Sequence, residues 1–236
     1  MKVTLINHTI DAEDLLIFTK STRLNLSVDL MIDIENMPAS KKADELKYMA
    51  NTIPSSWEFV DYVFLIEGVS RAYTHQQVRT RAGSYAQQTM RVTDQSDYDY
   101  IMPEAIQKDE TASNLINSIN CSIKLVYHSL LNMGHKAEDA RGILPTNIST
   151  NIICKFNLRT LSELAKSRTG GRTQAEYREV INGVIDCVLE VHPWAEDFLF
   201  QHDRDYFTEL EQFGKDKLES EERNIMLKII DKMRKE

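Results

Sequence analysis

Four arginines gather in one short part of the chain, among glutamine, serine and threonine residues. They are Arg71, Arg79, Arg81 and Arg91. A guanidinium group offers a fixed fork of donors that matches a phosphate, and neutral amide and hydroxyl side chains can bind the uncharged parts of a ligand. This mixture of residue types therefore indicates a phosphate site better than it indicates a solvated surface.

The elements that position these arginines can be inferred from the residues before them. An apolar segment at residues 60–66 is expected to form a buried strand. Ser70 is expected to cap a short helix, and that helix leads into a polar loop that carries the arginines. We interpret Arg71 as a structural residue that pairs with Glu67 or with a helix end.

Residues 79–91 resemble the signature of the flavin-dependent thymidylate synthases, which methylate C5 of dUMP. The family pattern is approximately R-H-R-x-x-S-x-x-x-x-S-x-R. The matching positions here are Arg79, Arg81, Ser84 and Arg91. Thr89 replaces the second serine with another hydroxyl residue, and Thr80 stands where the family has a histidine.

A second resemblance lies downstream and keeps the order and spacing of the family. It consists of an R-x-x-L-P element that begins at Arg141, an N-x-R pair at Asn157 and Arg159, and a distal arginine at Arg168. Ser56 lies in a segment that resembles a flavin-proximal element of the family. The resemblance covers about residues 40–195, and two ordered arginine motifs make it specific.

The resemblance implies a role for each matched residue. The nucleotide site would be lined by Gln76, Arg79, Gln87, Thr89, Arg91, Arg141 and Arg168. The FAD site would be lined by Ser56, Arg79, Thr80, Arg81, Asn157, Arg159 and Glu163. Arg168 would be the catalytic residue, because it matches the family arginine that polarises the pyrimidine at N3 and O4.

The resemblance also implies the reaction. NADPH would reduce FAD, methylenetetrahydrofolate would supply the carbon, and the substrate would be a pyrimidine nucleoside monophosphate; no metal is expected. Because Thr80 departs from the motif, two other hypotheses stay open. One is a C5 methylase or hydroxymethylase that acts on dCMP or UMP. The other is a catalytically silent homologue that binds nucleotide or flavin.

The expected architecture is a single domain of the α/β or α+β class over all 236 residues, with a central mixed sheet flanked by helices. Residues 203–236 would form a C-terminal helical extension. The family resemblance implies a homotetramer whose active sites are shared between subunits, since one chain of this length has too little concave surface for FAD and two substrates.

Hydrophobic periodicity predicts the remaining elements. Strands are expected at residues 2–6, 60–66 and 148–156. Helices are expected at residues 11–23, 41–49, 114–133, 137–144, 158–167, 173–191 and 215–236. An acidic, mobile loop is expected at residues 29–38.

Composition narrows the class of protein. The net charge of −8 argues against broad nucleic-acid binding, which needs a basic surface. The sequence has no long apolar run for a membrane span and no signal-peptide pattern, so a cytoplasmic protein is expected. The three cysteines are widely spaced and odd in number, and we expect them to be buried thiols.

Overall fold

The computed structural model describes residues 1–24, 29–200, 210, 213–214 and 218–233. The chain divides into two compact units, residues 1–200 and residues 201–236. The extension expected at residues 203–236 falls in the second unit, and part of it lies outside the described residues.

The first unit is built on a four-stranded sheet with the order β1-β2-β4-β3. The strands are β1 (Lys2–His8), β2 (Asp61–Ser70), β3 (Ser84–Gln87) and β4 (Ser149–Asn157). All three neighbouring pairs are antiparallel. The expectation of a mixed sheet is therefore wrong, because none of the described strand pairs runs parallel. The short polar strand β3 was expected to be loop.

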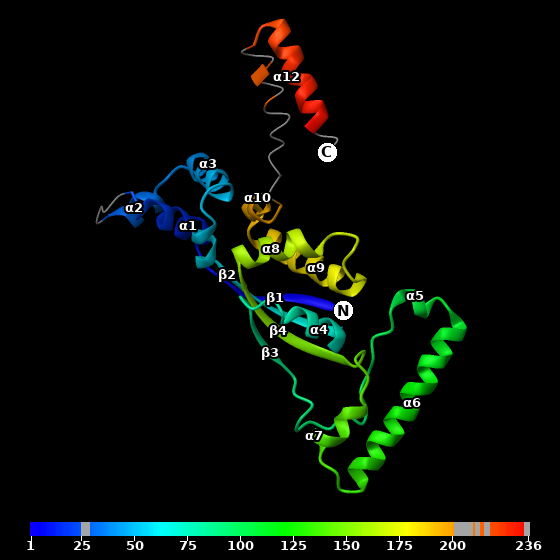
Figure 1. Cartoon of the computed structure of the whole chain (residues 1–236). Coiled ribbons are helices and arrows are strands. Elements are labelled where there is room, and N and C mark those ends of the chain that lie inside the picture. Colours follow the sequence, from blue (N-terminus) through cyan, green and yellow to red (C-terminus); the bar gives the residue numbers. More distant parts are fainter. Residues whose placement is uncertain (25–28, 201–209, 211–212, 215–217, 234–236) are drawn as a thin grey trace. The chain divides into compact units, whose positions relative to one another are not determined.

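The helices of the first unit form three groups around this sheet (Figure 1). The N-terminal group is α1 (Ala12–Ser21), α2 (Leu30–Glu35), α3 (Ala39–Ala50) and the 3₁₀ turn η1 (Pro54–Phe59). The central group is α4 (Arg71–Gln77), α8 (Leu158–Arg168), α9 (Ala175–Val191), η3 (Pro193–Ala195) and α10 (Glu196–Leu199). The third group is α5 (Glu104–Gln107), α6 (Glu110–Asn132), α7 (Ala137–Ala140) and η2 (Arg141–Ile143).

The core lies on one face of the sheet. In β2, Tyr62, Phe64 and Ile66 are buried, and in β4 Ile152 and Phe156 are buried, while the residues between them are more exposed. Helices α8 and α9 contact the sheet and join the same core. The strand at residues 60–66 is therefore half-buried rather than buried on both faces, as is usual in antiparallel sheets.

The end of β2 turns sharply into α4. Gly68 has a φ of +66°, a conformation that favours glycine, and the pairing of β2 with β4 shifts register between Ile66 and Val69. Ser70 caps α4 as expected, because its hydroxyl oxygen accepts a hydrogen bond from the Tyr73 backbone N–H at 3.0 Å.

The acidic segment at residues 29–38 contains helix α2, so the expectation of a loop is wrong. Leu30 and Ile34 lie one turn apart in α2, and both are buried in the core. The burial of these two side chains explains why a short acidic segment forms a helix here.

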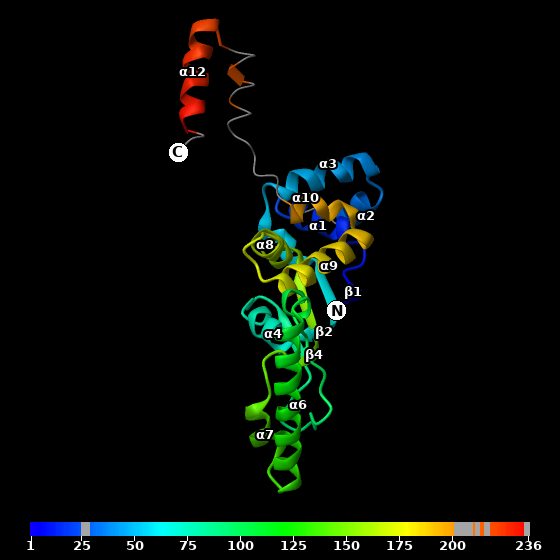
Figure 2. The ribbon, with the colours of Figure 1, turned by 90° about the vertical axis from the view of Figure 1, so that its right-hand side faces the viewer.

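Helix α6 is confirmed, but much of its apolar stripe stays exposed among the described residues. Leu115, Ile119 and Val126 are at least half exposed. The buried side of α6 instead carries Asn120 and Tyr127, and Asn120 Oδ1 accepts a hydrogen bond from the Tyr98 hydroxyl at 3.1 Å. Figure 2 shows α6 extending away from the sheet with α7 beside it.

The second unit contains helix α12 (Ser220–Met233). Its expected stripe faces outward, since Ile225, Ile229 and Met233 are each more than half exposed, while Ile230 is buried. Among the helices that the structure describes, none is both long and apolar enough to cross a membrane.

The three cysteines are free thiols in different environments. Cys154 is buried in β4, and burial raises its pKa to about 12. Cys187 is half-buried, and Cys121 is exposed on α6, so the expectation of three buried thiols is wrong for Cys121.

A buried histidine joins the end of α9 to the sheet. His192 is 8% exposed, and its Nδ1 lies 2.9 Å from the Tyr62 hydroxyl. Its ring meets the His8 ring edge to face, with 4.9 Å between centroids, and it also contacts the Trp194 ring. Burial, and then the positive charge of His8, lower the pKa of His192 to about 4.

This histidine should make the fold sensitive to acid. Because its pKa is about 4 in the fold and about 6.5 in the unfolded chain, the unfolded state takes up the proton first as the pH falls. Stability is therefore lost between about pH 6.5 and pH 4, by roughly 2 to 3 kcal/mol, with no further loss from this group below pH 4. Urea unfolding at pH 7 and pH 4.5 should show a smaller decrease for His192→Gln than for the unaltered chain. Equal decreases would contradict this assignment.

Candidate functional site

The pairing of β2 with β4 brings the two arginine tracts together. Ser70, at the end of β2, pairs with Ser149 at the start of β4. Just beyond this pair, the Arg71 N–H donates to the Ile148 carbonyl at 3.1 Å, and the Ala72 N–H donates to the Thr146 carbonyl at 2.8 Å. The first turn of α4 therefore lies against the segment that follows Arg141.

A carboxylate of α9 fixes the start of α4. The two oxygens of Glu176 accept hydrogen bonds from the Ser70 N–H and from the Ser70 hydroxyl, both at 2.6 Å. This two-point contact joins the N-terminal ends of α4 and α9, and it places the α8–α9 connection beside the first arginine tract. Charge-assisted bonds of this length are stronger than neutral ones.

Arg168 ends α8 and lies over an aromatic ring of α9. Its guanidinium carbon is 5.0 Å from the centre of the Tyr177 ring, a cation–π distance. Tyr177 is fully buried and meets the Tyr73 ring of α4 edge to face at 5.2 Å. Burial raises the pKa of Tyr177, while the nearby Thr80 side chain and the charge of Arg168 act in the opposite direction. Arg168 Nε and the Tyr177 hydroxyl have no hydrogen-bond partner of normal geometry among the described residues.

The turn between α4 and β3 carries Arg79, Thr80 and Arg81. The Tyr85 hydroxyl shares its one proton between the Thr80 carbonyl at 2.7 Å and the Gln77 carbonyl at 3.0 Å, which ties this turn to β3. A Cβ atom at Gly83 would come within 2.6 Å of the Phe156 ring, so the turn needs glycine to approach β4 this closely. The backbone is thus held firmly, while the side chains of Arg79 and Arg81 are exposed.

Two glutamines of the expected nucleotide set contact neighbouring elements. Gln87 of β3 donates to Thr74 Oγ1 at 3.0 Å and to Thr150 Oγ1 at 3.3 Å. Gln76 of α4 donates to the Gln174 side chain, which precedes α9. Gln76 and Gln87 are therefore held in place by side chains of α4, β4 and the segment before α9.

Arg91 and Thr89 lie on the loop after β3. The Arg91 N–H donates to Thr89 Oγ1 at 3.1 Å, and Arg91 Nε forms an ion pair with Glu138 of α7 at 3.0 Å. Arg141 follows α7 directly and is exposed. The carboxylate of Glu138 thus compensates the charge of Arg91, and an anionic ligand would have to replace that carboxylate.

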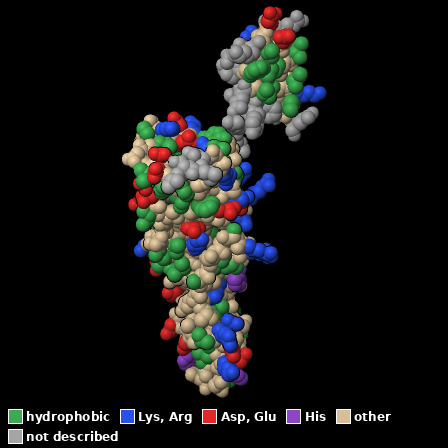
Figure 3. All heavy atoms as spheres, turned by 90° about the vertical axis from the view of Figure 1, so that its left-hand side faces the viewer, with side chains coloured by type: hydrophobic (Ala, Val, Ile, Leu, Met, Phe, Trp, Pro, Cys, Tyr) green, Lys and Arg blue, Asp and Glu red, His purple; other side chains and the backbone are tan. Residues whose placement is uncertain are grey.

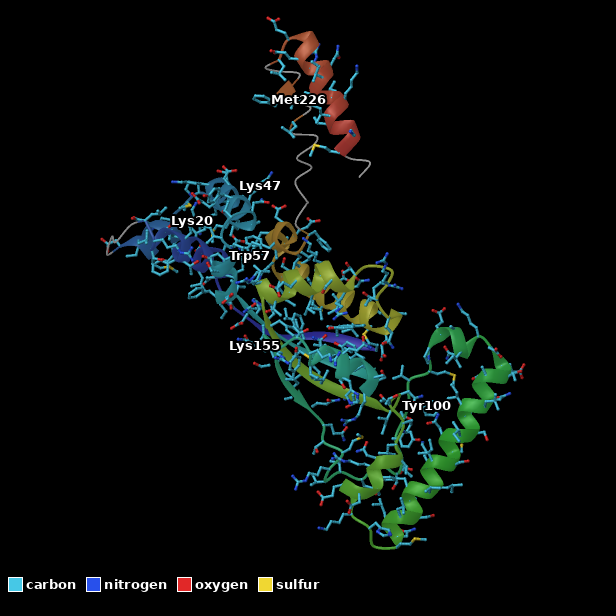
Figure 4. All side chains as sticks on the ribbon, in the orientation of Figure 1. Lys20, Lys47, Trp57, Tyr100, Lys155 and Met226 are labelled. Atoms are coloured by element: carbon cyan, nitrogen blue, oxygen red, sulfur yellow. The ribbon has the colours of Figure 1, made fainter. Side chains whose placement is uncertain are left out.

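The expected flavin residues outside the Arg79–Arg81 turn lie at the other end of β4. Arg159 forms ion pairs with Glu58 at 2.7 Å and with Glu163 at 3.6 Å. Asn157 caps α8 by accepting from the Thr160 N–H at 2.8 Å, and Ser56 is buried. Lys155, which Figure 4 labels on β4, lies near this end and pairs with Asp61 at 2.8 Å.

The expected site residues therefore form two groups along β4. The group at the Asn157 end contains Ser56, Asn157, Arg159 and Glu163, and the turn with Arg79, Thr80 and Arg81 approaches it through Gly83 and Phe156. The group at the Ser149 end contains Gln76, Gln87, Thr89, Arg91, Arg141 and Arg168.

Sequence reasoning gave no binding role to three residues that lie beside the second group, Arg71, Glu176 and Tyr177. Arg71 forms no ion pair with Glu67 among the described residues; its Nη2 donates to the Gln88 carbonyl at 2.5 Å instead. Glu176 and Tyr177 follow Arg168 in the sequence, and the sequence analysis gave neither residue a role. The position of Arg71 directly after the cap residue was the one available signal.

A hollow of about 470 Å³ lies next to Gln87. It is lined by Gln88 and Thr150 and by three carboxylates, Asp94, Asp97 and Asp99. The Ser96 N–H and hydroxyl both donate to Asp94, which lowers the pKa of Asp94. The carboxylates of Asp94, Asp97 and Asp99 are hydrogen-bond acceptors that lie beside Gln88 and Thr150. They belong to a loop outside the two arginine motifs.

The surface charge of the first unit is mixed on the face seen in Figure 3, where acidic and basic side chains lie close together. The described residues contain no group of three or more histidine, cysteine or acidic side chains that could hold a metal ion. On the face seen in Figure 3 the basic side chains therefore form no continuous patch.

Comparison with known proteins gives a family match. The family described as "Thymidylate synthase complementing protein" matches residues 4–194. Three similar proteins are each named "Flavin-dependent thymidylate synthase". The protein from Nitratidesulfovibrio vulgaris is 35% identical over 144 residues, the one from Pyrococcus furiosus 39% over 127 residues, and the one from Geobacter sulfurreducens 32% over 197 residues.

The matches cover different shares of the two chains. They span 58%, 52% and 82% of this chain in the same order, and 59%, 52% and 84% of the relatives. The chain thus matches little more than half the length of the first two relatives, and most of the length of the third.

The contact between Glu176 and Ser70 should stabilise the fold. Glu176→Gln keeps the size of the side chain but can accept only one of the two hydrogen bonds, so we expect a loss of about 1 to 3 kcal/mol in the free energy of unfolding. Glu179→Gln, an exposed position on the same helix, is the matched control and should change stability by less than about 0.5 kcal/mol. Urea unfolding measures both variants, and equal small effects would contradict this role for Glu176.

Proposed function

The chain belongs to the family of thymidylate synthase complementing proteins, and from this premise we propose that it is a flavin-dependent thymidylate synthase. It would methylate C5 of dUMP, with methylenetetrahydrofolate as carbon donor and NADPH as reductant. The observation that carries the proposal is Arg168, a half-buried arginine that lies 5.0 Å over Tyr177 at the meeting point of α4, α8 and α9.

The turn with Arg79 and Arg81 fits a flavin dinucleotide. Both side chains are exposed on a rigid backbone, and neither forms an ion pair among the described residues. Guanidinium groups of this kind suit a pyrophosphate. Arg159 fits less directly, because Glu58 and Glu163 already pair with it. When bound, FAD supplies the redox chemistry, and the protein supplies orientation and charge.

Arg168 would act on the pyrimidine. A guanidinium group beside N3 and O4 favours negative charge on the ring, and it thereby lowers the barrier to reaction through C5. The Tyr177 ring below holds the guanidinium in one orientation. The Nε atom of Arg168 is buried and has no hydrogen-bond partner of normal geometry among the described residues, although the guanidinium group interacts with the Tyr177 hydroxyl. A carbonyl oxygen of the base would offer this donor an acceptor.

One observation favours a pyrimidine nucleotide other than dUMP as the substrate. The hollow beside Gln88 and Thr150 presents the carboxylates of Asp94, Asp97 and Asp99. A carboxylate is the acceptor that the amino group of cytosine requires, whereas uracil offers a carbonyl oxygen at the same position. A methylase or hydroxymethylase of dCMP is therefore the alternative, followed by UMP and by a silent homologue that binds nucleotide or flavin without turnover.

The homotetramer with shared active sites is part of the proposal and is supported by α6. Its exposed Leu115, Ile119 and Val126 form an apolar stripe that no described residue of the first unit covers. A second copy of the chain would cover this stripe, because a site shared between subunits requires an interface between them. Light scattering should give four times the chain mass of 27.2 kDa, and a mass of one chain would contradict the proposal.

The cytoplasmic location and the absence of nucleic-acid and membrane partners stay predictions.

The reaction can be tested directly. The purified protein is incubated with FAD, NADPH and methylenetetrahydrofolate together with dUMP, dCMP or UMP, and the products are weighed by mass spectrometry. We expect a gain of one methyl group on dUMP. Arg168→Ala should reduce this turnover by about 10²- to 10³-fold, the range found when one transition-state donor is removed. Arg178→Ala on α9 removes the same charge from a position without an assigned role and is the control.

The outcomes separate the three hypotheses. Methylation or hydroxymethylation of dCMP without any reaction of dUMP would replace the proposal by its alternative. A protein that binds flavin but oxidises no NADPH and alters no nucleotide would support the silent homologue. Equal turnover in Arg168→Ala and the unaltered protein would remove Arg168 from the mechanism while leaving the reaction itself intact.

A further inference from the structure

One face of helix α12 is apolar and stays largely exposed among the described residues. Ile225, Ile229 and Met233 follow one another at intervals of four residues, so they lie along one side of the helix. Each of these three side chains, which we call the α12 stripe, is more than half exposed. Helix α12 lies beyond residues 4–194, which match the family, so the match gives this stripe no role.

The second unit buries a different side of the same helix. Ile230 is buried, and a Cβ atom at Gly214 would come within 3.2 Å of the Met226 sulfur, so the segment at Gly214 lies against Met226. Figure 3 shows further apolar side chains on the surface of this unit. One buried apolar side is enough to hold an amphipathic helix in place. A second, exposed apolar side therefore indicates a surface that binds something else.

Opposite charges stand at the two ends of the α12 stripe. Glu222 lies three residues before Ile225, hence on the same side of the helix, and it is exposed. Lys232 lies in the last turn beside Met233, and it is also exposed. The stripe thus begins at a negative charge and ends at a positive one, which makes it complementary to a copy of itself that runs in the opposite direction.

We propose that the α12 stripe binds the α12 stripe of a second copy of the chain, with the two helices antiparallel. With the two-fold axis at Leu227, Ile225 of each copy lies level with Ile229 of the other, and Glu222 lies level with Lys232. Each contact then occurs twice, as a symmetric interface between identical chains requires. A parallel pair would instead place Glu222 beside Glu222 and Lys232 beside Lys232, and like charges oppose such a pairing.

The pairing adds to other contacts between chains and does not replace them. A helix of 14 residues is about 21 Å long, and two such helices bury less than the roughly 1,200 Å² of a stable interface. Two chains that already meet elsewhere hold their α12 helices at a high effective concentration, where a weak contact can form. Exposed ion pairs add little affinity, so the charges mainly set the direction of the pair.

A lipid surface fits the α12 stripe less well than a second copy does. Helices that lie on membranes are rich in lysine and arginine on the polar side and keep the apolar side free of charge. Here Glu222 lies in line with Ile225 and Ile229, where it would face the lipid. An anionic membrane would repel this carboxylate, whereas Lys232 of a second helix would attract it.

Disulfide cross-linking of the full chain tests the pairing. Ile225→Cys and Ile229→Cys are made in a Cys121→Ser background, because Cys121 is an exposed thiol, and the two chains are co-expressed and oxidised. Trypsin separates the two positions, since Lys228 lies between them, so mass spectrometry identifies which cysteines are joined. Asn224→Cys is the matched control, because it is exposed on another side of α12.

We expect the link between positions 225 and 229 to form at least about fivefold faster than any link through position 224, because a disulfide needs Cα atoms within about 7 Å. Lys232→Glu should slow this link by roughly 3- to 10-fold, since it brings like charges together at both ends of the pair. Adding Glu222→Lys to Lys232→Glu should restore the rate, because the exchanged charges attract again in an antiparallel pair but not in a parallel one.

Equal rates at the three positions would overturn the inference, and so would links that join 225 to 225 and 229 to 229 in preference, which mark a parallel pair. If no link forms and the thiols at 225 and 229 react with a soluble maleimide more slowly than the thiol at 224, residues of the same chain cover the stripe and the inference is wrong. Binding to phosphatidylserine vesicles that Ile229→Asp abolishes, without cross-links, would assign the stripe to lipid instead. None of these measurements involves FAD or a nucleotide, so each outcome leaves the proposed function standing.

Discussion

The antiparallel pairing of β2 with β4 is the constraint on which the site depends. It places Ser70, where α4 begins, beside Ser149, so that residues more than seventy positions apart in the sequence share one end of the sheet. The same pairing places Asp61 beside Asn157, where α8 begins. Because α8 follows β4 and ends at Arg168, this one register brings the first arginine tract, the second tract and the distal arginine to neighbouring elements.

The chemistry of the site depends on where the acids are. The chain has a net charge of −8, yet neither Arg71 nor Arg168 forms an ion pair among the described residues, and the Nε groups of both have no hydrogen-bond partner of normal geometry there. The carboxylates that lie nearby have structural roles, as the contact of Glu176 with Ser70 shows. An excess of acid over the whole chain is therefore compatible with local positive charge, since short-range contacts decide which arginines are compensated.

Sequence periodicity predicted the long helices and three of the four strands, because these elements bury apolar side chains at regular spacing. It failed for segments whose secondary structure depends on contacts with the rest of the fold. The polar strand β3 forms because β4 offers it an edge, and α2 forms because Leu30 and Ile34 reach the core. Motif matching named the arginines but not their partners. Arg91 pairs with Glu138, whereas Arg71, expected to pair with Glu67 or a helix end, donates to the Gln88 carbonyl.

The central claim is that arginines from the two tracts bind the phosphate of a nucleotide. The most direct measurement follows the phosphorus-31 resonance of dUMP bound to the protein as the pH is varied. Free phosphate monoesters lose their second proton near pH 6, and neighbouring guanidinium groups favour the doubly charged form. We predict that the pKa of the bound phosphate is lowered by about one unit or more. A bound nucleotide whose phosphate titrates as it does in free solution would contradict the claim.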